Sequence, residues 1–369
     1  MNNTSNRIDW WEPQIGQKEK VLLNQVLESN FLNDGEFTTR FENKLKQLLG
    51  CKHVVAVTNG TSALFLALVG CGIGYDDEVI VPDITFIATA NAVTMTGAKP
   101  VFVDVDPNTL NLSPSGFKKA ITPKTKAVIP VHISGRPADM PAILKISKEH
   151  NIMVVEDAAE ALLSKLNNQF LGTIGNAGIL SFSPNKTITT GQGGAILTNN
   201  DNLYTRLREL KDQGRSIRGT GGNDVHDTIG YNFKLTNLQA SIGIAQLDYL
   251  VDRTNKMKHN YLQYQDGLKN LTEISLLPFN TANNEIPQWI DALTSKRDEL
   301  VEYLESHNVH CRKFWFPMHT HKPYRLTDEN FFHSTRLSNN AFWLPSSLSL
   351  TDSDIDYVCS LIKKFLKNS

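Results

Sequence analysis

The segment Ile179–Asn199, ILSFSPNKTITTGQGGAILTN, places one lysine, Lys186, in a polar loop between two apolar runs typical of strands. The loop also contains Gly191, Gly193, Gly194 and several hydroxyl side chains. Glycines let a backbone approach a ligand closely, and an amine held beside them suits a carbonyl cofactor bound as a Schiff base. The alternative is a lysine on a surface hairpin, so the neighbouring segments must decide.

Composition bounds the class of protein. The chain has 369 residues, of which 40% are hydrophobic and 20% charged, and its formal net charge is −1. These values are ordinary for a globular enzyme, and a chain of this length usually divides into two domains. The charge balance gives no sign of a nucleic-acid or membrane partner. The N-terminus lacks the apolar core of a signal peptide, no apolar run is long enough to span a bilayer, and the four cysteines are scattered. We therefore expect a soluble, cytoplasmic protein with reduced thiols.

Short β-branched runs alternate with helical patterns between residues 50 and 200. The runs are HVVAV (53–57), EVIV (78–81), PVFVDV (100–105), AVIP (127–130) and IMVV (152–155). Apolar strands separated by helices predict an α/β fold whose mostly parallel sheet is covered on both faces. A single long helix is predicted over residues 237–258, and the pattern then changes to helix–strand–helix. We predict a large cofactor-binding domain over residues 1–250 and a smaller C-terminal α/β domain over residues 251–369.

Three of the predicted strands end in residues that suit a ligand, and open α/β sheets bind ligands at the carboxyl ends of their strands. After HVVAV, Gly60 and Thr61 begin a helix whose first N–H groups can hold a phosphate or form an ordinary helix start. Asp157 follows IMVV, where its carboxylate could bind a ribose, a metal or a pyridinium N–H, or cap a helix. Phe86 follows EVIV, where its ring could stack on a cofactor or fill the core.

Other cofactors are disfavoured by the motifs. There is no GxxxxGK[ST] sequence, the GCGIG run (70–74) follows a helical pattern instead of preceding one, and the histidines show no metal-ligand spacing. A phosphate cradle, a stacking ring, a carboxylate and a lysine are the set that pyridoxal 5′-phosphate requires, and they occur here in that order. We therefore predict pyridoxal 5′-phosphate as the cofactor and no metal site.

The chain also resembles a known family, the nucleotide-sugar aminotransferases of pyridoxal-phosphate fold type I. The similarity runs from FLNDGEFTTRFE (31–42) to LPS (344–346), and its most specific motifs are TNGTSAL (58–64), VEDAAEAL (155–162), SFSPNKTITTGQGGAI (181–196), GYNFKLTNLQASIGIAQL (230–247) and FWFPMHT (314–320). The resemblance implies the fold type I architecture, with a large domain around a mostly parallel sheet and a smaller C-terminal α/β domain.

The resemblance also assigns the cofactor contacts. Lys186 would form the Schiff base, Asp157 would bind the pyridine nitrogen, and Phe86 would stack on the ring. The phosphate would be bound by Gly60, Thr61 and Ser181. Lys186 and Asp157 are therefore the predicted catalytic residues.

Four further residues are assigned by the resemblance alone. Glu160 would contact the phenolic oxygen of the cofactor or a nearby water. Asn232 would reach the phosphate of the neighbouring subunit, which implies a homodimer with shared active sites. Asn33 and His319 would line the sugar-nucleotide pocket.

By the same resemblance, the enzyme would move an amino group from L-glutamate to a nucleotide-linked keto-6-deoxy sugar in O-antigen or lipopolysaccharide sugar biosynthesis. Carbon 4 of a GDP-linked 4-keto-6-deoxymannose is favoured. UDP- or dTDP-linked 4-keto or 3-keto sugars stay open, because the chain looks shorter than its relatives between Trp289 and Arg297, near the sugar-nucleotide pocket. A related dehydratase would carry histidine in place of Lys186, and the intact pair of Lys186 and Asp157 disfavours a non-catalytic, regulatory protein that merely binds the cofactor.

Overall fold

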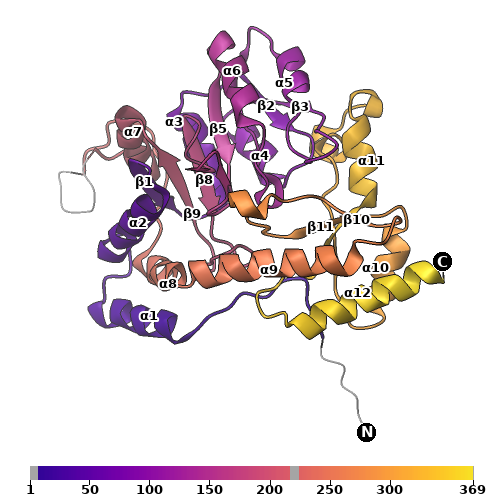
Figure 1. The fold of residues 1–369 in the computed structure, drawn as a ribbon. Helices are drawn as coiled ribbons and strands as arrows, with labels where there is room; N and C mark the ends of the chain where they lie inside the picture. Colours follow the sequence, from indigo (N-terminus) through magenta and orange to yellow (C-terminus); the bar gives the residue numbers. More distant parts are fainter. Residues whose placement is uncertain (1–6, 217–223, 369) are drawn as a thin grey trace.

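The computed structural model describes residues 7–216 and 224–368, and its core is a seven-stranded sheet (Figure 1). The strands lie in the order β1 (His53–Val57), β9 (Gly194–Thr198), β8 (Ala177–Ser181), β5 (Met153–Asp157), β4 (Thr125–Val128), β2 (Glu78–Pro82) and β3 (Lys99–Val103). In this sheet β9 runs antiparallel to both of its neighbours, and the other six strands share one direction. The predicted mostly parallel sheet is therefore confirmed, and each of the five predicted runs contributes a strand.

Helices cover both faces of this sheet. One face is covered by α3 (Gly60–Gly70), α4 (Ala88–Met95) and α7 (Asp201–Lys211). The other is covered by α2 (Glu36–Leu49), α5 (Pro114–Ala120), α6 (Met140–His150) and α8 (Asn237–Leu247). Successive strand residues point to opposite faces, so Val155 packs in the first layer and its neighbour Val154 in the second. Burial on both faces explains why these strands are continuous apolar runs instead of alternating ones.

The C-terminal part has its own four-stranded antiparallel sheet. Its strands are β10 (Ser275–Leu276), β11 (Ile290–Leu293), β13 (Ala341–Leu344) and β12 (Arg312–Lys313), in that order. One face packs on α9 (Leu250–Leu268), α10 (Arg297–Glu305) and α12 (Asp352–Lys367). On the other face, Trp343 packs against Ile84 and Val131, which follow strands of the large sheet. The small sheet therefore lies against the carboxyl-terminal edge of the large one. The division of the chain at residue 250 stays a prediction.

The remaining elements are short or peripheral. They are α1 (Gln17–Ser29), α11 (Phe332–Asn340), the hairpin of β6 (Lys165–Leu166) and β7 (Gln169–Phe170), and 3-10 turns at Ile133–Gly135, Thr281–Asn283, Met318–Thr320, Lys322–Tyr324 and Asp328–Asn330. No helix in the part of the chain described here is both long and apolar enough to cross a membrane.

The single helix predicted over residues 237–258 is wrong in one respect, because the structure divides it into α8 and α9. Asp248 ends α8, and its carboxylate lies 3.3 Å from the Lys18 amine and 3.2 Å from the Lys44 amine. The two helices continue in nearly the same direction (Figure 1). Apolar residues therefore recur at helical spacing across the break, and periodicity alone could not reveal it.

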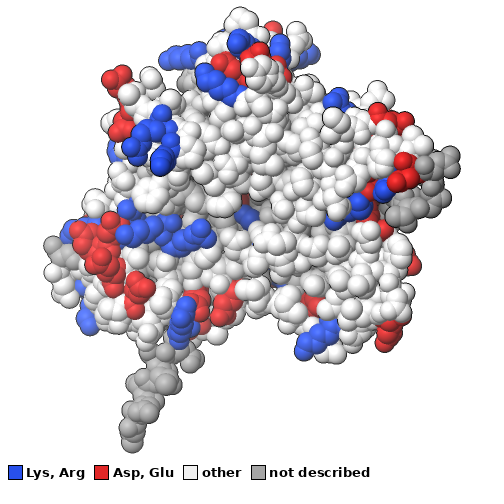
Figure 2. Space-filling view, turned by 180° about the vertical axis from the view of Figure 1, so that it is seen from behind, with Lys and Arg blue, Asp and Glu red and all other residues white. Residues whose placement is uncertain are grey.

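The surface combines scattered charge with exposed apolar side chains. On the face shown in Figure 2, Lys and Arg lie mainly toward the edges together with Asp and Glu, and the middle is mostly uncharged and hollowed. Large apolar side chains exposed in the single chain include Phe31, Leu32, Phe86, Val225, Ile229 and Phe316. Apolar exposure of this kind is common where a protein meets a partner.

Candidate active site

A cavity of about 400 Å³ lies where β1, β5 and β8 end. Seven of the predicted site residues line it, namely Gly60, Thr61, Phe86, Asp157, Glu160, Ser181 and Lys186. They converge because parallel strands bring their carboxyl ends to the same edge of the sheet. Their positions agree with one shared site, whereas their individual roles stay predictions.

One end of the cavity is the start of α3. Asn59 caps this helix, and its side-chain oxygen accepts a hydrogen bond of 2.8 Å from the Ser62 N–H. Gly60 and Thr61 occupy the first turn, where N–H groups have no acceptor inside the helix and the helix dipole favours an anion. A Cβ on Gly60 would lie 3.1 Å from Cβ of Ser181, so the glycine lets the strand end and the helix start approach. This end fits the phosphate of the predicted cofactor.

The carboxylate of Asp157 lies at the end of β5 and is almost fully buried. The Thr89 hydroxyl donates a hydrogen bond of 2.8 Å to Asp157 Oδ2, and Thr85 in turn donates to the Thr89 hydroxyl oxygen over 2.8 Å. Burial raises the pKa of Asp157, while the Thr89 hydrogen bond and the charge of Lys186 act in the opposite direction. A buried carboxylate whose charged form is costly calls for a cation beside it, and a protonated pyridine nitrogen meets that need.

Lys186 and Glu160 form the reactive centre of the cavity. The Lys186 amine lies 3.4 Å from Glu160 Oε1 and 4.6 Å from the centroid of the Trp289 ring. Glu160 Oε2 accepts a hydrogen bond of 2.9 Å from the Ser134 N–H. Burial raises the pKa of Glu160 to about 7, although the Lys186 charge opposes the rise. Near neutral pH this carboxyl group can therefore accept or release a proton beside the lysine amine.

The loop that carries Lys186 is held rigidly from the C-terminal part of the chain. The Thr187 N–H and hydroxyl both donate to the side-chain oxygen of Gln288, over 3.1 and 2.5 Å. The Thr187 carbonyl accepts a hydrogen bond of 2.9 Å from Arg253. These bonds fix the backbone next to the lysine, so its amine has a defined position in the cavity.

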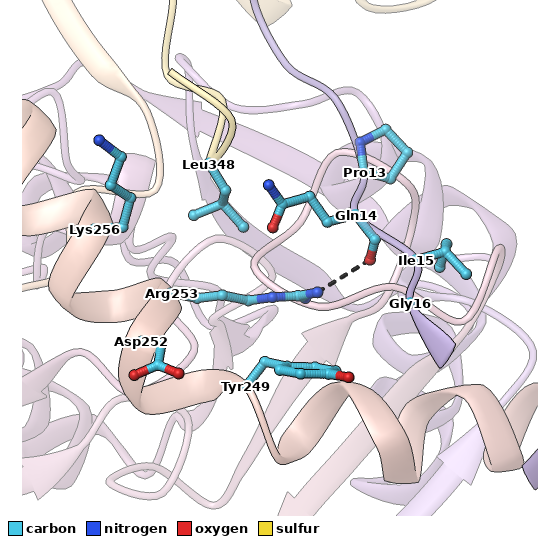
Figure 3. Close-up of a pocket in the computed structure, with 9 residues that line it drawn as sticks. All are labelled: Pro13, Gln14, Ile15, Gly16, Tyr249, Asp252, Arg253, Lys256 and Leu348. Atoms are coloured by element: carbon cyan, nitrogen blue, oxygen red, sulfur yellow. Dashed lines mark hydrogen bonds between the residues drawn. The ribbon is translucent and has the colours of Figure 1, made fainter. Parts of the chain in front are cut away.

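A second cavity, of about 620 Å³, lies between the N-terminal segment and the start of α9 (Figure 3). The Arg253 guanidinium extends toward the N-terminal segment and donates to the Gln14 carbonyl over 3.1 Å and to the Gln246 side-chain oxygen over 2.5 Å. Together with its bond to Thr187, these contacts make Arg253 a junction between three segments. None of the predicted site residues lines this larger cavity. The candidate active site is therefore the smaller cavity around Lys186.

The C-terminal part supplies a wall that was not predicted. Trp289, Arg312 and Trp315 line the cavity opposite the large sheet, and the rings of Trp315 and Phe86 lie 6.3 Å apart. No local pattern marks these residues, because they belong to separate strands and loops of the second sheet. Thr89 was missed although a signal existed, since its spacing of four residues from Thr85 places both hydroxyls on one helical face.

Three predicted residues lie outside this cavity. Asn33 and Asn232 are exposed on the surface of the single chain. His319 is fully buried instead, with Nδ1 at 2.7 Å from Asp83 Oδ2 and Nε2 at 3.0 Å from Asp328 Oδ1. Both ring nitrogens are thus engaged by carboxylates, and the structure does not bring His319 to the sugar-nucleotide pocket expected from the sequence. Its motif marks a residue that joins two parts of the chain.

Comparison with known proteins agrees with this geometry. The model of the DegT/DnrJ/EryC1/StrS aminotransferase family matches residues 13–363. The chain is 36% identical over 366 residues to GDP-perosamine synthase of Escherichia coli O157:H7, covering 97% of this chain and 98% of that protein. Among solved structures, S. venezuelae DesV in complex with a ketimine intermediate matches with a TM-score of 0.89 at 30% identity, over 94% of both chains. DesI in the presence of its TDP-sugar product matches with a TM-score of 0.90 at 29% identity, over 97% of this chain and 92% of that one. The chain therefore belongs to the DegT/DnrJ/EryC1/StrS aminotransferase family and is a sugar aminotransferase that depends on pyridoxal 5′-phosphate.

Proposed function

We propose that this enzyme transfers the amino group of L-glutamate to carbon 4 of a GDP-linked 4-keto-6-deoxy sugar. The observation that carries the proposal is the similarity to GDP-perosamine synthase, which extends through nearly the whole length of both proteins. The cavity supports it, because it combines an anion site at the start of α3, a buried carboxylate and a lysine amine in one space.

The bound cofactor supplies an electron-accepting ring and carries the amino group between the two substrates. The residues of the chain supply position and proton transfer. Asp157, held by Thr89, faces the place where positive charge is needed on the ring. The amine of Lys186 takes the proton from the donor carbon and returns a proton when the sugar is aminated. Glu160 lies within 3.4 Å of that amine and can exchange a proton with it, while the Trp289 ring covers the amine and excludes water.

The nucleotide is the weakest part of the assignment, because solved DesI contains a TDP-sugar product. The connection between β11 and α10 spans only residues 294–296 and follows Trp289 closely, where the chain looked shorter than its relatives. A dTDP- or UDP-linked sugar, ketonic at carbon 4 or carbon 3, is therefore the second candidate.

The deciding experiment is turnover with L-glutamate of a panel of GDP-, UDP- and dTDP-linked 3-keto and 4-keto-6-deoxy sugars, with products identified by mass and NMR. We expect a 4-amino sugar from the GDP-linked 4-ketone. Faster turnover of another member would replace the proposed substrate. If glutamate fails to bleach the visible absorbance of the loaded protein, or Lys186→Ala turns over normally, the aminotransferase mechanism proposed for this cavity is wrong.

We also propose a homodimer with shared active sites. Asn232 does not line the cavity of its own chain, and its side chain is exposed, as a residue that serves a second copy must be. Phe31, Leu32 and Ile229 are exposed apolar residues that a partner could cover. Mixed dimers of Lys186→Ala and Asn232→Ala chains should regain part of the activity, since one of the two sites is then intact. Mixtures no more active than the parent variants would contradict the shared site.

The biological setting follows from the substrate class. We place the enzyme in the cytoplasm, in the synthesis of amino sugars for O-antigen or another surface glycan. Deletion of the gene should remove the amino sugar from the surface polysaccharide and leave the nucleotide-linked keto sugar to accumulate. An unchanged polysaccharide would contradict this setting without affecting the assignment of the reaction.

A further inference from the structure

Arg312 is an arginine of the cavity wall whose hydrogen-bond donors are free. It lies on β12, and its guanidinium carbon is 4.9 Å from the Trp10 ring centroid and 5.6 Å from that of Trp343. The guanidinium makes no hydrogen bond or ion pair to any residue in the described ranges 7–216 and 224–368. Arg253 differs, because three of its bonds go to the protein. Arg312 is thus oriented by aromatic rings while its planar fork of N–H groups stays available.

The charge around Arg312 is equally informative. The charged residues that line the cavity in the described part of the chain are Asp157, Glu160, Lys186 and Arg312. Burial lowers the pKa of Arg312 and the charge of Glu160 opposes this, so the two groups are close enough to interact. Glu160 itself lies 3.4 Å from the Lys186 amine. When Lys186 carries the cofactor, Arg312 is the remaining permanent cation near the place where a substrate amine must react.

We infer that Arg312 binds the α-carboxylate of the amino donor. The inference rests on the proposed function, because it assumes an amino acid donor that reacts at the Lys186 position. An arginine fork matches a carboxylate in a bidentate pair, which fixes both position and orientation. The α-carboxylate is attached directly to the carbon that loses the proton, so its receptor must lie beside the lysine.

The other anion that enters the site is the pyrophosphate of the sugar nucleotide. It is attached at carbon 1 of the sugar, on the opposite side of the ring from the ketone at carbon 4. A cation beside Glu160 and Lys186 is therefore placed for the carboxylate, whereas the pyrophosphate must be bound farther from the reacting carbon. Arg312 accordingly selects amino acid donors over simple amines.

The test uses the cofactor-loaded protein and donors that bind without reacting through. The analogue 2-methyl-L-glutamate lacks the proton that transamination removes, so its Kd can be measured from the change in visible absorbance. Two smaller probes separate the carboxylates: 2-aminoisobutyrate keeps only the α-carboxylate, and isopropylamine has none. The variants are Arg312→Gln, Arg312→Lys and the control Lys313→Gln, which removes the adjacent cation of β12 that pairs with Asp298 at 3.0 Å.

We expect Arg312→Gln to raise the Kd of 2-methyl-L-glutamate and of 2-aminoisobutyrate by about 10- to 100-fold, the usual loss for a hydrogen bond to a charged group. Arg312→Lys should give a smaller rise because it keeps the charge and loses the fork. Isopropylamine should bind equally to every variant, and Lys313→Gln should bind all three probes like the parent. Thermal unfolding and the visible spectrum of the loaded variants identify any that fail to fold, and Arg312→Lys keeps the test decisive if Arg312→Gln does.

Three results would overturn the inference. An unchanged Kd for 2-aminoisobutyrate in both variants removes the α-carboxylate contact. An equal loss for isopropylamine would mean that Arg312 acts through the shape of the cavity. A rise in KM for the sugar nucleotide with unchanged donor affinity would assign the arginine to the pyrophosphate. Failure of the proposed function is distinct, because the parent would then bind and deaminate glutamate but aminate no keto sugar.

Discussion

Replacing Glu160 by glutamine should make the cofactor-free protein more stable at alkaline pH than at acidic pH, relative to the parent. Burial raises the pKa of Glu160 from 4.5 to about 7. The folded state therefore keeps the proton over a range in which the unfolded state has lost it, so the unfolding free energy of the parent falls as pH rises through this range. Glu160→Gln has no proton to lose there. The difference between variant and parent must then grow with pH, whatever its value at low pH.

The magnitude follows from the two pKa values. With 1.36 kcal/mol per pKa unit, the shift corresponds to a difference that grows by about 2.5 kcal/mol between about pH 5 and pH 8. The side chain is 5% exposed, so screening by solvent reduces this little. Glutamine also preserves the acceptor for the Ser134 N–H, so the folded structure should be retained.

Urea unfolding of both proteins across this pH range measures the difference directly, at one fixed protein concentration because a dimer unfolds in a concentration-dependent way. Glu149→Gln is a matched control, since this glutamate lies exposed on α6. It should show no trend with pH. A difference for Glu160→Gln that stays constant within about 0.5 kcal/mol would refute the reasoning that burial holds the proton on this carboxyl group.

Three further perturbations have defined outcomes. Thr89→Val removes the hydroxyl that holds the buried carboxylate of β5, so the Kd for pyridoxal 5′-phosphate should rise about 10-fold or more and recover in Thr89→Ser, as read from visible absorbance; an unchanged Kd would contradict this role. Gly194→Ala places a Cβ 2.5 Å from the Asn59 carbonyl oxygen, and the loss should be about 1–3 kcal/mol in urea unfolding, with normal stability showing that the α3 start can shift. Arg136→Met leaves the buried Asp291 carboxylate without its partner at 2.5 Å, which should cost about 3–5 kcal/mol. Adding Asp291→Asn to that variant should restore part of the loss, and no recovery would mean that packing and not charge is responsible.

Much of the large domain could be predicted because its signals are local. The five apolar runs are buried on both faces, so each has a composition that a surface loop would not tolerate. Gly60 could be placed at a helix start from its neighbours alone, and the loop of Lys186 was bounded by two evident strands. The break between α8 and α9 could not be placed, because both helices share one direction and keep one periodicity across it.

The candidate site divides in the same way. Lys186 and Asp157 each follow a strand, so their meeting at the carboxyl edge of the sheet was predictable from the parallel topology. Trp289 and Arg312 reach the cavity from a second sheet with its own core, and no spacing in the sequence connects them to Lys186. His319 illustrates the opposite failure, since a motif marked the residue correctly as distinctive while its ring lies between two carboxylates outside the cavity.

The sequence by itself determined the chemistry: a lysine, a carboxylate and a phosphate cradle at strand ends, in the order that pyridoxal phosphate requires. It could do so because these features depend on residues close to one another along the chain and on the shared direction of parallel strands. Only the tertiary structure decided the environment of that chemistry. Burial, which raises the pKa of Glu160, and the free guanidinium of Arg312 both arise where the second sheet packs on the first. Packing between distant segments sets solvent exclusion and charge, and neither can be read from local pattern.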